Sequence, residues 1–162
     1  MALILSKKVI GADNQQERLK IANWICGFVD GEGCFSVSVI KNKTTKFGNQ
    51  IFPEFVITQG AKSLTALEEI KNFFGCGRIF INKRYDNHNE NLYRYCVRCL
   101  SDLENKIIPF FLENKLRTFK KKDFIIFKKV IKIMSSKKHL NKSGRNKILR
   151  LISKMNRRKK RF

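Results

Sequence analysis

Residues 24–33 read Trp-Ile-Cys-Gly-Phe-Val-Asp-Gly-Glu-Gly, and this stretch decides how the chain folds. Gly27 and Gly31 lie four positions apart and share one helix face, although each weakens a helix by roughly 1 kcal/mol relative to alanine. Small residues at this spacing let two helix backbones approach closely. The stretch therefore predicts a helix that packs against another helix through its glycines.

Two acids, Asp30 and Glu32, stand at the C-terminal end of this helix, where the macrodipole is negative. A cation would offset that cost, and carboxylates with nearby carbonyl oxygens suit Mg²⁺ or a similar hard ion. A glycine-rich helix end carrying two solvated acids explains the pattern equally well, because short Gly/Asp turns are common.

Hydrophobic periodicity around the stretch predicts the other elements. We expect a loose arm over residues 1–13, an N-cap at Asp13 or Asn14 and a helix over about 15–30. Two strands, 34–42 and 50–58, follow, and Pro53 indicates an edge or a bulge in the second of them. Later elements are a helix over 63–74, strands over 78–84 and 92–99, and helices over 102–114, 121–134 and 143–155. Asp102 would cap the helix over 102–114, and Pro109 would break or kink it.

This order of elements predicts an α+β fold in which one four-stranded antiparallel sheet has helices on a single face. The 162 residues fit one domain, with a core over about 15–135 and a basic C-terminal helix and tail over about 143–162. No stretch has the length of a secretory or membrane segment, so membrane attachment is not expected.

Charge is the strongest compositional signal, with 35 Lys and Arg against 13 Asp and Glu, a net charge of +22. Nucleic acid is the first partner to consider and an acidic membrane surface the second. Strand alternation predicts an exposed sheet face of hydrogen-bonding side chains that can read base edges, or that is simply solvated. The residues on that face are Ser36, Ser38, Asn42, Gln50, Asn82, Arg84, Arg94 and Arg98.

Other candidates are weaker. The five cysteines suggest free thiols, and the Cys96–Cys99 spacing lacks a second ligand pair for zinc. His88 suits a turn, and the basic run at 157–161 suits DNA contact, an address signal or a solvated tail. Abundant Lys, Asn, Ile and Phe are typical of an A/T-rich genome, which points to an organelle.

The 24–33 stretch resembles the signature of the LAGLIDADG homing endonucleases in its GFVDGEG form. The resemblance extends to the strands that follow, to Val56-Ile57-Thr58-Gln59 and to the basic run 120–124. It implies the αββαββα fold of that family, whose sheet forms a DNA-binding saddle. It also implies a homing endonuclease that cuts both strands of double-stranded DNA across the minor groove by metal-dependent hydrolysis.

The resemblance further implies roles for particular residues. Glu32, with the Gly31 carbonyl, would bind a divalent metal, Mg²⁺ before Mn²⁺ or Ca²⁺, while Asp30 would be structural. Gln59 would position the attacking water, and Lys120, with Lys122 close by, would activate water or stabilise charge. Some relatives have an arginine where Ser63 stands here, and Lys62 is the nearest substitute.

A single motif implies a homodimer and a long, roughly palindromic target. The residues expected at the dimer interface are Ile25, Gly27, Phe28 and Gly31. The alternative from another class is an intron maturase that binds intron RNA with the same fold, with or without cleavage. The set of Glu32, Gln59 and Lys120 favours cleavage, because a pure RNA binder needs no metal carboxylate. A non-catalytic basic protein would explain the charge but not these residues.

Overall fold

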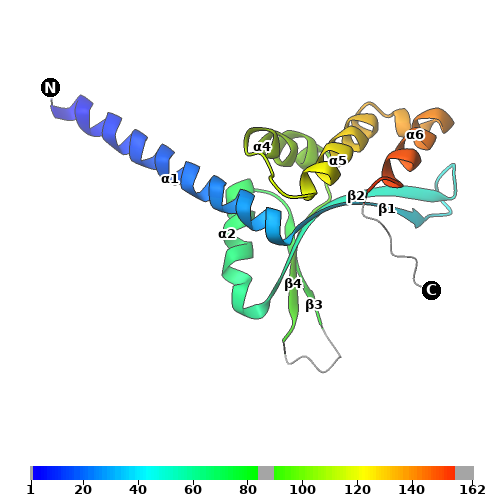
Figure 1. Ribbon diagram of the computed structural model, residues 1–162, viewed down its shortest axis with the longest axis horizontal. Coiled ribbons are helices and arrows are strands. Elements are labelled where there is room, and N and C mark those ends of the chain that lie inside the picture. Colours follow the sequence, from blue (N-terminus) through cyan, green and yellow to red (C-terminus); the bar gives the residue numbers. More distant parts are fainter. Residues whose placement is uncertain (1, 84–89, 156–162) are drawn as a thin grey trace.

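The computed structural model describes residues 2–83 and 90–155, and side chains from residue 14 onward. Four antiparallel strands form one sheet in the order β1-β2-β4-β3, and the helices pack on one of its faces (Figure 1). This is the α+β architecture predicted from the sequence. Along the chain the main elements are α1 Ala2–Glu32, β1 Gly33–Lys41, β2 Asn49–Gly60, α2 Leu64–Phe74, β3 Arg78–Asn82, β4 Leu92–Val97, α4 Ile108–Glu113, α5 Lys120–Ser135 and α6 Lys142–Ile152.

Helix α1 corrects the expected loose arm at the N-terminus. It begins at Ala2, so neither Asp13 nor Asn14 caps it, and the helix projects away from the sheet at its N-terminal end (Figure 1). Residues 2–13 contain no proline and are rich in Leu, Ile, Lys and Ala. A helix already formed over residues 15–30 extends through such residues at little cost, because propagation is easier than nucleation.

Asp102 was also expected to cap a helix, and this is wrong. The helical region begins two residues earlier with α3 Leu100–Asp102, continues as a π-helical turn η2 Leu103–Ile107, and becomes α4 at Ile108. Pro109 directly follows the π-helical turn, so its missing N–H falls where the hydrogen-bond pattern changes from η2 to α4. The expected break at Pro109 therefore takes the form of a change in helix type.

Strand β2 is central in the sheet, yet it is locally an edge at Pro53. Pro53 pairs with Val37 of β1, whereas pairing with β4 begins only at Phe55, opposite Val97. Because β4 does not reach as far as Pro53, the N–H group that proline lacks is not needed for a hydrogen bond to β4.

Short 3-10 turns, η1 Ala61–Ser63 and η3 Lys138–Leu140, precede α2 and α6.

Phenylalanine rings join the sheet to the helices. Phe35 of β1 and Phe55 of β2 are buried, with ring centroids 5.1 Å apart. Phe35 also contacts Phe111 of α4 at 5.3 Å and Phe124 and Phe127 of α5 at 5.2 and 5.5 Å. These contacts hold α5 against β1 and fix where α5 begins. Among the helices of residues 2–83 and 90–155, none has the length and apolarity needed to cross a membrane.

The turn from α1 into β1 has no linker, because β1 begins at the residue after Glu32. A Cβ atom at Gly33 would lie 2.5 Å from the Val29 side chain and 2.9 Å from the Val29 carbonyl oxygen. Only glycine therefore permits the strand to start at this point.

We expect Gly33→Ala to lower the free energy of unfolding by about 1–3 kcal/mol, since the added methyl group overlaps backbone that cannot move aside. Urea denaturation at fixed protein concentration measures the change. Ser38→Ala, at an exposed position on the same strand, is the control and should change stability by less than about 0.5 kcal/mol. Equal stability of both variants would contradict the packing argument.

Candidate functional site

The C-terminal end of α1 lies against the N-terminal end of α5. The Lys120 ammonium donates hydrogen bonds to the Val29 carbonyl, at 3.2 Å, and to the Gly31 carbonyl. Carbonyls in the last turn of a helix lack partners within the helix, and a lysine there also complements the negative end of the dipole. Lys120 thus lies at the end of the 24–33 stretch, beside the carbonyl groups of Val29 and Gly31.

Asp30 makes the reciprocal contact. Its carboxylate accepts from the backbone N–H of Arg117 at 2.7 Å and of Thr118 at 3.1 Å, and from the Thr118 hydroxyl at 2.8 Å. Burial raises the pKa of Asp30, but the hydrogen bonds from Arg117 and Thr118 and the charge of Lys120 outweigh it, so the pKa is lowered overall. Asp30 is therefore a structural acid, as expected, and it holds the segment that leads into Lys120.

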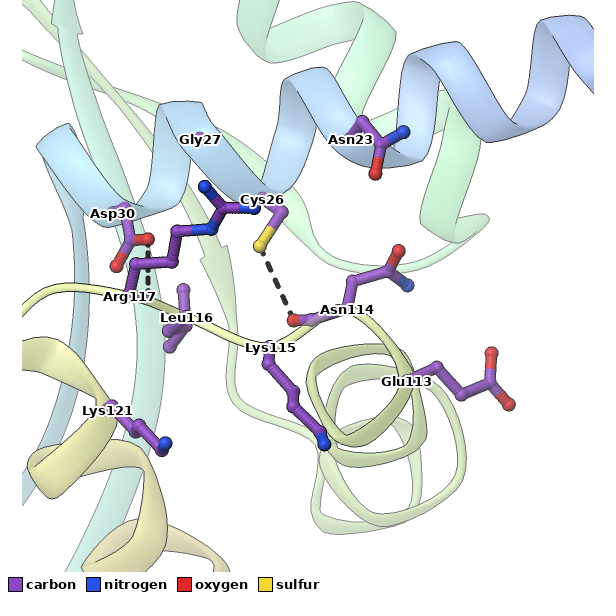
Figure 2. Close-up of a pocket in the computed structure, with 10 residues that line it drawn as sticks. All are labelled: Asn23, Cys26, Gly27, Asp30, Glu113, Asn114, Lys115, Leu116, Arg117 and Lys121. Carbon is purple, nitrogen blue, oxygen red and sulfur yellow. Dashed lines mark hydrogen bonds between the residues drawn. The ribbon is translucent and has the colours of Figure 1, made fainter.

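A groove runs between α1 and the segment that joins α4 to α5 (Figure 2). Gly27 and Asp30 line it from α1, while Lys115, Arg117 and Lys121 line it from the other side. The Cys26 thiol donates to the Asn114 carbonyl at 3.4 Å across one end of the groove. The groove combines an open helix face with three basic side chains.

Glu32 and Gln59 approach each other through strand pairing. The β1–β2 ladder pairs Gly33 with Ile57, so Glu32 and Gln59 lie one and two residues beyond the same pair. Glu32 is exposed and Gln59 is partly exposed. One end of the sheet therefore gathers Glu32, Gln59 and Lys120, which are far apart in sequence. Lys122 lies two positions after Lys120, about 200° further around α5, with its ammonium 5.3 Å from the Phe119 ring centroid.

The glycine face of α1 is open. A Cβ atom at either Gly27 or Gly31 would meet nothing within 4 Å. Trp24, which the sequence reasoning overlooked, lies on this face with 38% of its surface exposed, and its ring is 5.5 Å from that of Phe28. Ile25 was expected on this face, but it is completely buried in the core of its own chain. The error follows from helix geometry, because Ile25 lies two positions before Gly27, which places it about 200° around the helix from the glycine.

The outer face of the sheet, which carries no helices, holds the side chains expected there. Strand register places Ser36 and Ser38 of β1, Gln50 of β2, Asn82 of β3 and Arg94 of β4 on it. Asn42 donates to the Gln50 side chain at 3.2 Å. Arg84 lies outside the described residues, as do His88 and the basic run at 157–161.

Glu54 is the residue on this face that the sequence reasoning missed. It is buried, and it binds Arg94 at 3.1 Å and also Arg98. No sequence pattern links positions 54, 94 and 98, which meet only because β2 pairs with β4.

The weaker candidates carry no site in the structure. All five cysteines are free, as expected. Burial raises the pKa of the Cys26, Cys34, Cys76 and Cys96 thiols and keeps them neutral. Among the described residues no group of three or more His, Cys, Asp or Glu side chains could hold a metal ion.

The sequence of this chain matches the family model of the LAGLIDADG endonucleases over residues 25–131. The chain belongs to the LAGLIDADG endonuclease family. The matched range contains every element of the site, from the end of α1 through the sheet to the first part of α5.

Solved LAGLIDADG structures share the fold. The homing endonuclease I-TnaI superposes with a TM-score of 0.74 at 39% identity, over 83% of this chain and 87% of that one. Meganuclease I-SmaMI bound to uncleaveable DNA gives 0.75 at 38% identity, over 84% of this chain but 45% of its own. A probable intron-encoded endonuclease of Neurospora crassa is 31% identical over 129 residues, 80% of this chain and 26% of that protein. The chain spans about a quarter of the length of such curated relatives.

We expect Asp30→Asn to destabilise this LAGLIDADG chain by about 1–2 kcal/mol at neutral pH, because an amide is a weaker acceptor for the Arg117 and Thr118 donors. The folded-state pKa of Asp30 is lowered, so its contribution is present above the ordinary value of about 3.9 and is lost as pH falls through the folded pKa. The difference from wild type should therefore shrink in acid. Urea denaturation over a pH series measures this.

The control is Glu32→Gln, which alters an exposed acid two residues away. It should leave stability unchanged across the series. A difference between wild type and Asp30→Asn that persists undiminished below the folded pKa would contradict the ionic role of Asp30.

Proposed function

We propose that this chain is a site-specific homing endonuclease that acts as a homodimer and hydrolyses both strands of a long, roughly palindromic DNA site. The observation that carries the proposal is that strand register and the Lys120 hydrogen bonds bring positions 32, 59 and 120 to one end of the sheet, beside the open glycine face of α1. Family membership supports the reaction class, since the matched family is one of endonucleases. DNA as substrate is supported by relatives whose structures hold DNA, including I-SmaMI bound to cleaved DNA.

Each residue of the site has a chemical task in this proposal. Gln59 would hold the attacking water by hydrogen bonding to it. Lys120, already anchored at the helix end, would stabilise the negative charge that builds on the phosphate oxygens in the transition state. Lys122, which is exposed, would add positive charge near the same phosphate. The polar outer face of the sheet would contact base edges in the major groove.

A divalent metal fits the residues at this site, although one chain offers only part of its coordination shell. Glu32 supplies an exposed carboxylate. The adjacent Gly31 carbonyl accepts from the Lys120 ammonium in this structure, so it would join a metal shell only if Lys120 turned toward the phosphate. Mg²⁺ typically keeps several waters and needs only one or two carboxylates together with substrate phosphates. Such an ion would polarise the phosphate and lower the pKa of bound water. I-SmaMI has been solved with its DNA target in the presence of calcium ions, which supports a role for a divalent ion in this family.

The homodimer is supported by the open glycine face of α1. I-SmaMI matches this chain over 45% of its own length, so its fold has room for a second unit of this size beside the first. The open face formed by Gly27 and Gly31 would let the two α1 helices meet with the two Glu32 side chains near the axis. Phe28 and Trp24 would flank that contact.

Intron RNA remains the alternative ligand, because the basic charge and polar sheet would serve a maturase equally. The presence of an exposed Glu32 beside Lys120 favours cleavage of DNA. Relatives named as intron-encoded, and one named for an intron of ND4, support an origin in an organelle intron.

Glu32→Gln should reduce cleavage at least about a hundredfold while leaving DNA affinity unchanged, because it removes the metal carboxylate but no element of the sheet. The assay incubates a randomised duplex library with Mg²⁺, sequences the cut ends, and then measures binding to the recovered target. Glu69→Gln, an exposed acid on α2, is the control and should cut normally. Loss of binding together with cutting would overturn the catalytic role.

Gly27→Leu should abolish the dimer without unfolding the chain, since a leucine finds open space in one copy but occupies the contact between two. Sedimentation should give twice the chain mass of 19.0 kDa for wild type and the single mass for the variant. Thr65→Leu, which adds the same apolar group at an exposed position on α2, should remain dimeric. A monomeric wild type would refute the proposed assembly.

A further inference from the structure

Glu54 occupies an unusual position for an acid. It lies on the outer face of β2, opposite Ser36 of β1, on the side of the sheet that has no helices over it. Nevertheless it is only 8% exposed. A carboxylate removed from water to this degree is costly unless its charge is matched, so its partners must be held close.

Two arginines from strand β4 and the residue after it cover the carboxylate. The Arg94 Nη2 donates to Glu54 Oε1 at 3.1 Å, and the Arg98 Nε donates to Glu54 Oε2. Each carboxylate oxygen therefore holds one guanidinium. The bond to Glu54 is also the main reason that the pKa of Arg98 is raised, so Arg98 stays charged.

Two rings restrain Arg98 further. Its guanidinium carbon lies 4.9 Å from the ring centroid of Phe80 on β3 and 5.5 Å from that of Phe52 on β2. Both distances are within the range of a cation–π contact. An ion pair on one side and two rings beside it leave the guanidinium plane little freedom.

Both arginines keep unused donors. An arginine has five N–H groups. Arg94 gives one to Glu54, whereas Arg98 gives one to Glu54 and one to the Cys96 sulfur at 4.0 Å. Their side chains remain 38% and 40% exposed, so a ligand on this face can reach them. The planar fork of a guanidinium matches the O6 and N7 acceptors of guanine in the major groove. A guanidinium group that is already held in place before DNA binds loses less side-chain entropy on binding.

We propose that Glu54 is a positioning residue that determines specificity, by fixing Arg94 and Arg98 to read guanines in the duplex on the outer face of the sheet. This inference rests on the proposed function. Glu54 also reduces the local charge, because two arginines and one carboxylate sum to +1 rather than +2. Attraction to phosphates of any sequence is thereby weakened, while oriented contact with the correct bases is retained.

A purely structural ion pair would predict a different result. Loss of Glu54 would then alter stability and overall affinity but not the order of preference among DNA sequences. The pattern of base preference therefore separates the two roles.

The test compares the homodimer of wild type, Glu54→Gln, Arg94→Ala and Arg98→Ala on a randomised duplex library with Mg²⁺, reading preferences from the cut ends. We expect Arg94→Ala and Arg98→Ala each to lose a guanine preference at distinct base pairs. Glu54→Gln should lose about tenfold of the preference at those same base pairs while still cutting. Glu68→Gln on α2 adds the same charge at an exposed position in the helical layer and should keep the wild-type pattern.

An unchanged preference pattern in Glu54→Gln would overturn this inference and leave the proposed nuclease intact. A wild type that neither cuts nor binds any duplex would overturn the proposed function, and the reading role with it. Thermal melting followed by circular dichroism shows whether Glu54→Gln folds. If Glu54→Gln does not fold, the variants Arg94→Lys and Arg98→Lys take its place in the test, because lysine keeps the positive charge but lacks the planar guanidinium group. Preserved guanine preferences in both lysine variants would equally overturn the inference.

Discussion

The contact between the C-terminal end of α1 and the N-terminal end of α5 is the interaction on which the rest of the site depends. Each end carries charge that its own helix dipole disfavours, with acids at the end of α1 and lysines at the start of α5. Bringing the two ends together offsets both costs. Lys120 donates to the last carbonyls of α1, and Asp30 accepts from the backbone just before α5. Gly33 then allows β1 to begin directly after α1 without a linker. The pairing of β1 with β2, which starts at Gly33 and Ile57, therefore depends on the same contact between α1 and α5.

Local patterns in the sequence were sufficient to predict the element order and the sheet. Strict alternation from Phe35 to Val39 predicted β1, and Gly75, whose φ of 57° suits glycine, ended α2 where expected. The start of α1 was not predictable in the same way, because residues 2–13 lack a strong signal and continue a helix that forms elsewhere. Asp102 is not a cap because the helical region already begins at Leu100, which packs against the core.

The residues of the site likewise differ in how far the sequence alone could identify them. Glu32, Gln59 and Lys120 could be proposed from the sequence because its resemblance to a family signature points to them, and their catalytic roles stay predictions. Ile25 was assigned to the wrong face because proximity in sequence was taken for proximity on the helix surface. Glu54 was missed because its role comes only from pairing between strands about 40 residues apart, as the 40 and 44 positions that separate it from Arg94 and Arg98 show. A lone acid in an apolar strand gives no sign of its partners.

The distribution of charge explains how general attraction and selective contact can coexist in one small chain. From Phe124 to Met155 the sequence has ten Lys and Arg residues and no Asp or Glu, so much of the net charge of +22 lies in the helical layer. Such charge attracts any polyanion and steers encounter, but it carries no sequence information. The arginines on the sheet are instead partly neutralised and held still by Glu54. The lysines and arginines of the helical layer can therefore attract DNA of any sequence, while the arginines held on the sheet make the few contacts that discriminate among sequences.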